Sequence, residues 1–228
     1  MKIWKNIIIS ALVLLYSHNS YSDANKTLRT IPNNVYYCGF SCANEVYPYA
    51  KLSQGTYAAN DLSSWEFWGR GRVDSNWLSG YRASIYVNDA RREVVIAYSG
   101  TEFYSLGDDI TDLGQYFGVL PRQYYEGVVT ALDVINIVKA YNKSNNDSYS
   151  ITLTGHSLGG GIAQFVAGAL DQKAITFNPA PISNGVALTM AKVNDYIHQN
   201  NIPSILGNRS ITNIVSRDED NSVVHNLG

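Results

Sequence analysis

The chain has 228 residues, 45% of them hydrophobic and 16% charged, and a formal net charge of −2 at pH 7. Its 17 basic and 19 acidic side chains nearly balance, so we expect no electrostatic attraction to nucleic acid. The length suits one domain with a sizeable core, and neither repeats nor low-complexity tracts divide the sequence.

Residues 1–22 are typical of a secretory signal peptide. Two lysines precede the apolar run Ile7–Tyr16, and Ser20-Tyr-Ser22 places small residues at the positions that a signal peptidase reads. The run is about ten residues long, whereas a membrane-spanning helix needs about 20, so an uncleaved anchor is the less favoured interpretation. We therefore expect residues 23–228 to form a single α/β domain that is secreted or periplasmic.

Cys38 and Cys42 are the only cysteines and lie in Cys-Gly-Phe-Ser-Cys. In an exported chain this spacing favours a small disulfide loop near the mature N-terminus, and free buried thiols are the alternative. A metal site would need further ligands, and the nearest histidines in the sequence are His18 and His156. We expect neither a metal nor an organic cofactor.

The first predicted element is a helix over Tyr47–Asn60, where small and apolar residues recur at helical spacing. An aromatic group follows in a polar, glycine-bearing segment; it comprises Trp65, Phe67, Trp68 and Trp77. Ordinary loop and core packing is the favoured interpretation of this group, and a lipid-facing surface is the alternative.

A hairpin is predicted next, with strands over Tyr81–Val87 and Glu93–Tyr98 joined at Asn88-Asp89. The second strand is strongly apolar, which favours a central position in the sheet. It runs directly into Ser99-Gly100-Thr101, a glycine turn at the end of a strand.

Arg122–Lys143 is predicted to form a long helix, because one side of it carries an apolar stripe: Tyr124, Val128, Leu132, Ile135 and Val138. A polar loop, an apolar strand over Tyr149–Thr154 and a second helix follow. This order predicts a crossover unit with a parallel sheet behind it.

Gly155-His156-Ser157-Leu158-Gly159 lies between that strand and that helix and matches the G-x-S-x-G nucleophile elbow. Glycines on both sides allow the tight turn that exposes the serine, so Ser157 is the predicted nucleophile. The Leu158 N–H, at the start of the helix, is one predicted oxyanion donor, and the Thr101 N–H is the other. The alternatives are a glycine-rich turn with a solvent serine, and a Thr101 that only shapes its turn.

Lys173–Phe177 and Ser210–Val215 are predicted as further strands, with a helix between them that is marked by Val186, Met190, Val193 and Ile197. The last strand is followed by Asp218 and Asp220. In doubly wound sheets the chemistry lies at the carboxyl ends of the strands, so one aspartate should meet Ser157 there. We favour Asp218 as the triad acid because it follows the strand most closely, and Asp220 is the alternative.

The predicted catalytic base is His225. It follows the aspartates, as the chain order Ser, Asp, His of this kind of triad requires. His18 would leave with the signal peptide, His156 is fixed inside the elbow, and His198 sits at the end of a predicted helix. The alternative is that His225 is an exposed terminal residue and that the true base lies beyond Gly228.

Most of residues 23–228 resembles the class 3 lipases. The resemblance rests on four segments: Tyr49-Ala-Lys-Leu-Ser53 with Tyr57, Val87–Thr101, Asp109-Ile-Thr-Asp-Leu113 and Gly155–Gly160. It implies an α/β-hydrolase fold, with helices on both faces of a mostly parallel sheet, and the activity of a lipase or phospholipase. The chain departs from the family at Ser99, where an arginine is usual.

These observations together predict an exported serine esterase that hydrolyses carboxylic esters of lipids, triacylglycerol or phospholipid, at a lipid interface. The alternative is a catalytically degenerate or C-terminally truncated hydrolase domain that binds lipid.

Overall fold

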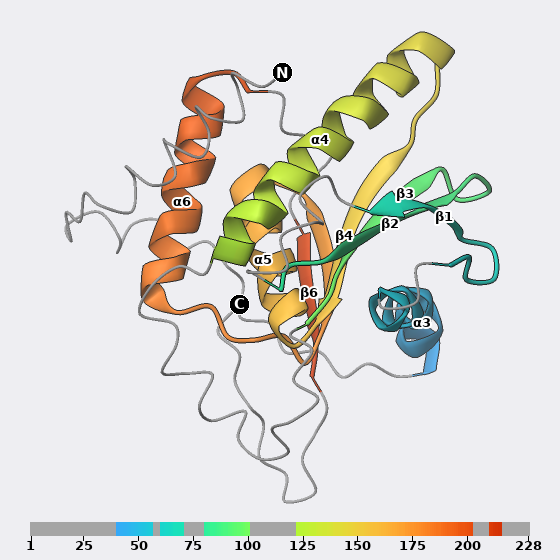
Figure 1. Cartoon of the computed structure of the whole chain (residues 1–228), viewed down its shortest axis with the longest axis horizontal. Helices are drawn as coiled ribbons and strands as arrows, with labels where there is room; N and C mark the ends of the chain where they lie inside the picture. The colour runs from blue at the N-terminus through green and yellow to red at the C-terminus, as the bar shows by residue number, and fades with distance from the viewer. Residues whose placement is uncertain (1–39, 57–59, 71–79, 101–121, 203–209, 216–228) are drawn as a thin grey trace, which may run out of the picture.

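The computed structural model describes residues 40–56, 60–70, 80–100, 122–202 and 210–215 (Figure 1). The predicted signal peptide and Cys38 lie outside these residues. In chain order, the elements are α3 (Phe40–Gly55), β1 (Glu66–Arg70), β2 (Ala83–Asn88), β3 (Glu93–Tyr98), α4 (Arg122–Asn145), β4 (Ser150–His156), α5 (Leu158–Leu170), β5 (Lys173–Phe177), α6 (Asn184–Gln199) and β6 (Ser210–Ile214).

The strands form one six-stranded sheet whose spatial order follows the sequence, β1-β2-β3-β4-β5-β6. The β1–β2 and β2–β3 pairs are antiparallel, whereas β3, β4, β5 and β6 run parallel to one another. Parallel neighbours need crossover connections, and helices α4, α5 and α6 supply them. The carboxyl ends of four strands therefore meet at one edge of the sheet.

Helices cover both faces of the sheet, as the sequence predicts (Figure 1). Side chains alternate along the central strand β3: Val94, Ile96 and Tyr98 belong to the core cluster on the side of α4, α5 and α6, whereas Val95 and Ala97 belong to the cluster on the side of α3. All six residues of β3 are buried, which explains its unbroken apolar sequence. Figure 1 shows α5 between α4 and α6, so the helix after the elbow is enclosed on all sides.

Most predicted elements are confirmed, and their bounds shift by a few residues. Helix α3 differs more, because it begins at Phe40 and ends at Gly55, earlier at both ends than predicted. Proline is usually tolerated only in the first turn of a helix, so Pro48 favours a start near Tyr47. The structure instead places Pro48 inside the helix.

The aromatic segment contains a strand that the sequence does not reveal. Glu66–Arg70 forms the edge strand β1, whose pairing with β2 shifts between Phe67 and Gly69. Strand β1 contains a bulge and, within the described sheet, pairs with only one other strand. Its sequence therefore lacks the regular alternation of apolar and polar residues by which strands are identified. Trp65 is 4% exposed and packs on Tyr49, whereas Trp68 is 48% exposed; Trp77 lies outside the described residues.

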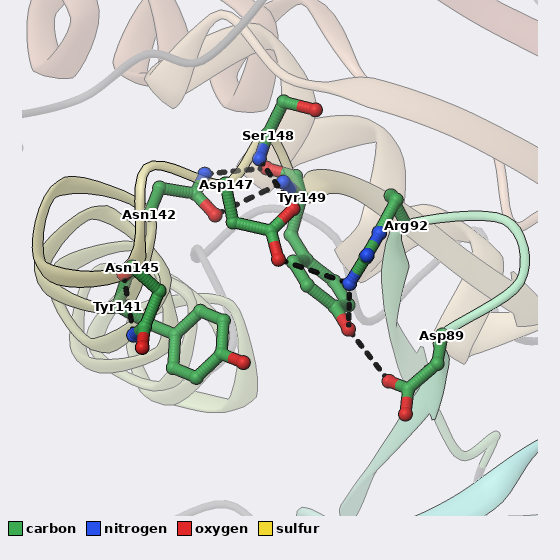
Figure 2. Close-up of polar contacts among 8 residues, drawn as sticks. All are labelled: Asp89, Arg92, Tyr141, Asn142, Asn145, Asp147, Ser148 and Tyr149. Atoms are coloured by element: carbon green, nitrogen blue, oxygen red, sulfur yellow. Dashed lines mark hydrogen bonds and ion pairs between the residues drawn. The ribbon is translucent and has the colours of Figure 1, made fainter.

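A polar network marks the amino-terminal edge of the parallel strands (Figure 2). Arg92 Nη1 donates to Asp147 Oδ2 at 2.9 Å and to the Tyr149 hydroxyl at 3.1 Å, and that hydroxyl donates to Asp89 Oδ1 at 2.6 Å. Asn142 exchanges two hydrogen bonds with the backbone of Tyr149. The network fastens the end of α4 to the β2–β3 hairpin, at the edge opposite to the elbow.

Cys42 is disulfide-bonded, and the sequence holds only one other cysteine, Cys38. None of the helices within the described residues is long and apolar enough to cross a membrane. The division into a signal peptide and one domain over residues 23–228 stays a prediction.

Candidate active site

Ser157 alone makes the turn between β4 and α5, because the strand ends at His156 and the helix begins at Leu158. Its backbone has φ 54° and ψ −126°, a region that residues other than glycine rarely adopt. Such a conformation costs on the order of 1–3 kcal/mol and persists only where the surroundings enforce it. Ser157 therefore has the strained backbone that the elbow motif predicts.

Three backbone hydrogen bonds hold Ser157 in this conformation. Its N–H donates to the carbonyl of Phe177 at 3.2 Å, and its carbonyl accepts from Gly161 at 3.0 Å and from Ala180 at 2.8 Å. The bonds come from β5, from α5 and from the loop after β5. The position of the serine is thus fixed by three separate segments.

Two glycines allow the elbow to close. A Cβ on Gly155 would overlap the backbone of Gly159, and a Cβ on Gly159 would overlap the carbonyl oxygen of Tyr98 and lie 2.8 Å from the carbonyl carbon of Ser99. Only glycine fits at either position without a shift of the backbone. The first turn of α5 therefore lies directly against the end of β3, where the predicted oxyanion turn begins.

The amino terminus of α5 is suited to stabilise negative charge. The Ser157 side chain makes no capping hydrogen bond, and the first N–H that bonds within the turn is that of Gly161. The N–H groups of the first helical turn lack partners inside the helix and carry the positive end of its dipole. The Leu158 N–H, next to the serine, is where an oxyanion donor is needed.

Ser99 holds the end of β3, from which the chain enters the turn that carries the second predicted oxyanion donor. Its N–H and its hydroxyl both donate to the carbonyl of Arg82, at 3.0 and 3.1 Å. Ser99 is buried, and these bonds tie the end of β3 to the residue before β2. They support the turn at the position where class 3 lipases usually carry an arginine. Thr101 lies outside the described residues, so its role stays a prediction.

The last strand ends at the same edge as the elbow. His156 is paired with Phe177, and Phe177 with Ile214, so the end of β6 is two strand spacings, about 10 Å, from the end of β4. The Ile214 carbonyl accepts from the Asn178 N–H at 2.8 Å. The chain leaves β6 at the edge where a triad acid would be required. Asp218, Asp220 and His225 lie outside the described residues.

His198 is fixed at the far end of the molecule. Its Nε2 lies 2.6 Å from Asp171 Oδ2, and Asp171 caps the carboxyl end of α5. Helix α5 has 13 residues and is about 20 Å long, which separates His198 from Ser157 by the whole helix. His198 therefore cannot act on the Ser157 hydroxyl, and His225 stays the predicted base.

An amide pair between α5 and β6, one member buried and the other half-buried, is not predicted from the sequence. Gln164 in α5 and Asn213 in β6 hydrogen-bond to each other at 3.0 Å. The sequence signal for Gln164 is that it is the one polar side chain in the apolar pattern of α5, whereas β6 also carries Ser210 and Thr212, so Asn213 does not stand out. Elsewhere, the described residues hold no group of three or more His, Cys, Asp or Glu side chains that could bind a metal ion.

Comparison with known proteins agrees with this geometry. Residues 41–216 match a phospholipase-like family model described as a Tle-like phospholipase domain. An extracellular phospholipase A1 of Serratia liquefaciens is 33% identical over 140 residues, which are 60% of this chain and 40% of that relative. The chain thus spans about two fifths of the length of the curated relative that it matches.

A solved structure has the same fold. A fungal lipase in complex with an inhibitor superposes with a TM-score of 0.50 at 16% identity, over 78% of this chain and 72% of the lipase. Lip2 lipase from Yarrowia lipolytica gives a TM-score of 0.49 at 20% identity, over 81% and 74% of the two chains. The predicted α/β-hydrolase fold and the resemblance to class 3 lipases are confirmed. The chain belongs to the phospholipase-like family of Tle-like phospholipase domains.

Proposed function

We propose that the protein is a serine esterase that hydrolyses carboxylic ester bonds of lipids through an acyl-enzyme. The backbone of Ser157 carries this proposal, because a strained serine between a buried strand and a buried helix is the arrangement that presents a nucleophile. The family of the chain and the name of its Serratia relative support phospholipid as the favoured substrate, with triacylglycerol as the alternative.

In the proposed reaction, Ser157 Oγ attacks the acyl carbonyl while His225 accepts its proton. Asp218 orients the imidazole, and the N–H groups of Leu158 and Thr101 stabilise the oxyanion. When the tetrahedral intermediate collapses, the ester C–O bond breaks, and the proton passes from His225 to the leaving alcohol. Water then attacks the acyl-enzyme by the same route and releases the fatty acid.

The proposal is tested by fatty-acid release from phosphatidylcholine vesicles and from triacylglycerol emulsions. We expect release from the vesicles, abolished by Ser157→Ala and reduced about as strongly by His225→Ala, because members of a triad act as a unit. Asp218→Asn should be impaired and Asp220→Asn much less. Ser150→Ala is the matched control, because Ser150 is exposed at the opposite end of the same strand. No release by the folded wild-type protein would contradict the proposal and favour a lipid-binding domain.

Export to the periplasm or beyond is part of the proposal. The disulfide of Cys42 supports it, since disulfides persist in oxidising compartments, and the Serratia relative is named as extracellular.

A further inference from the structure

The helix that follows the nucleophile carries one polar side chain. All residues of α5 from Leu158 to Leu170 are buried, and all except Gln164 are glycine, alanine or larger apolar residues. Gln164 is 2% exposed, so its amide must be paired within the protein, because a buried polar group without a partner is destabilising. The hydrogen-bond partners of the Gln164 amide indicate what this side chain does.

A chain of hydrogen bonds runs from the elbow to the last strand through Gln164. The Ser157 carbonyl accepts from the Ala180 N–H at 2.8 Å, and the Ala180 carbonyl accepts from Gln164 Nε2 at 3.4 Å. Gln164 Oε1 accepts from Asn213 Nδ2 at 3.0 Å, and Asn213 Oδ1 accepts from the hydroxyl of buried Thr176 at 2.7 Å. Helix α5, strands β5 and β6 and the loop after β5 are thereby joined.

Asn213 lies where its side chain can specify the register of β6. It is paired with Thr176 across the β5–β6 ladder and lies on the same face of β6 as Ile211, which packs against the core. A slip of β6 by two residues would keep the faces of the strand but place an apolar side chain opposite Gln164. The residues of β6 are only half-buried or exposed, so burial alone specifies its position weakly. The amide pair provides the missing specificity.

We propose that Gln164 and Asn213 are positioning residues of the ester-hydrolysing site. They fix the carboxyl end of β6, from which the chain continues toward Asp218, relative to the carbonyl of Ser157. This inference rests on the proposed function for its catalytic part, whereas the register of β6 can be measured without it.

The decisive variant is the double substitution Gln164→Met with Asn213→Leu. Replacing both amides by apolar groups of similar size leaves neither amide unpaired, but the buried Thr176 hydroxyl and the Ala180 carbonyl each lose a partner. We therefore expect some loss of stability, and kcat is measured on the folded variant. The elbow and β6 then lose their side-chain link. We expect kcat for ester hydrolysis to fall roughly ten- to hundredfold while KM changes little, because small displacements of catalytic groups have effects of this size.

Two controls separate positioning from folding. Gln172 is also buried, donates to the carbonyl of Leu170 and lies at the far end of α5, so Gln172→Met should leave kcat unchanged in the folded protein. Thr176→Ser keeps the hydroxyl that Asn213 requires, whereas Thr176→Val removes it at nearly constant volume. We expect the serine variant to retain kcat and the valine variant to lose it.

Hydrogen exchange of the β6 amides gives a readout that does not depend on activity. We expect exchange in residues 211–215 to be at least roughly tenfold faster in the double variant than in the wild type. A folded double variant with wild-type kcat and wild-type exchange would overturn the inference. A wild-type protein without esterase activity whose β6 still loosens in the double variant would refute the proposed function and support the register role. If the double variant does not fold, equal kcat in Thr176→Val and Thr176→Ser would overturn the inference.

Discussion

At the scale of single residues, the site depends on one unfavourable backbone conformation that its neighbours enforce. Ser157 adopts a positive φ, and its N–H and carbonyl are held by Phe177, Gly161 and Ala180. The strain keeps the hydroxyl at the turn, where it makes no capping bond with the helix. Substitutions that displace any of these contacts should therefore lower the proposed catalytic activity of Ser157 without changing Ser157 itself.

The substitution Gly159→Ala tests this dependence. The added Cβ would overlap the Tyr98 carbonyl oxygen, so the backbone must shift, and we expect a loss of about 1–3 kcal/mol in the free energy of unfolding. The elbow moves with it, so ester hydrolysis should fall in the fraction that remains folded. Denaturant unfolding and turnover by the folded variant measure the two effects.

Gly185→Ala is the matched control for that variant. Gly185 is also helical, in α6, but a Cβ there meets nothing within 4 Å. Alanine is the better helix former by up to about 1 kcal/mol, so stability should stay equal or rise and activity should stay unchanged. Equal effects of the two substitutions would contradict the close approach of α5 to β3.

At the scale of elements, buried tyrosines attach the helices to the sheet and to one another. Tyr49 of α3 donates to the Glu93 carboxylate at 2.9 Å, Tyr98 of β3 donates to the Gly127 carbonyl of α4 at 3.2 Å, and Tyr124 of α4 packs on Phe165 of α5. Burial raises the pKa of Tyr49, Tyr98 and Tyr124 above the ordinary value of 10, and the Glu93 charge raises that of Tyr49 further. The folded protein therefore resists their ionisation.

This predicts unfolding at alkaline pH. Because the folded-state pKa values are raised, the stabilisation is complete below the unfolded-state pKa near 10 and is lost progressively as pH rises above it. We expect little change in the free energy of unfolding between about pH 8 and pH 9 and a steep fall above pH 10, with the tyrosinate absorbance of the buried tyrosines appearing together with the loss of helical circular dichroism. Full tyrosine ionisation in a protein that stays folded would contradict the buried positions.

Much of this architecture follows from local sequence patterns. Buried apolar strands such as Glu93–Tyr98 and the strand-turn-helix order around Ser157 are fixed by periodicity and glycine placement, so the sequence predicts them. The edge strand β1 and the pairing of Gln164 with Asn213 depend on neighbours distant in sequence. The roles of Thr101, Asp218 and His225 follow from chain order and stay predictions, because they lie outside the described residues.

At the scale of the whole molecule, the parallel strands divide the protein into two ends. The elbow, the end of β3 and the end of β6 meet at the carboxyl edge, whereas His198, Asp171 and the network of Figure 2 lie at the opposite edge. The amino-terminal edge holds contacts between α4 and the β2–β3 hairpin, and the proposed mechanism places the chemistry at the carboxyl edge. This separation is general for doubly wound sheets.

The export proposal makes a prediction for the intact protein. When expressed with its own N-terminus in a secreting host, the mature chain should begin near Asp23 and gain the mass of two hydrogens on reduction, because Cys42 is disulfide-bonded. Intact-mass spectrometry with and without reductant measures both. A chain that retains residues 1–22 and has two free thiols in the host cytoplasm would contradict export.

Covalent labelling of the folded protein with a fluorophosphonate tests the central claim most directly, because the probe reacts only with an activated serine. We predict that one probe is attached per chain, that peptide mass spectrometry maps it to Ser157, and that Ser157→Ala abolishes labelling while Ser150→Ala labels like the wild type. Attachment at another serine, or an unlabelled wild-type protein with an intact fold, would contradict the assignment of Ser157 as the nucleophile.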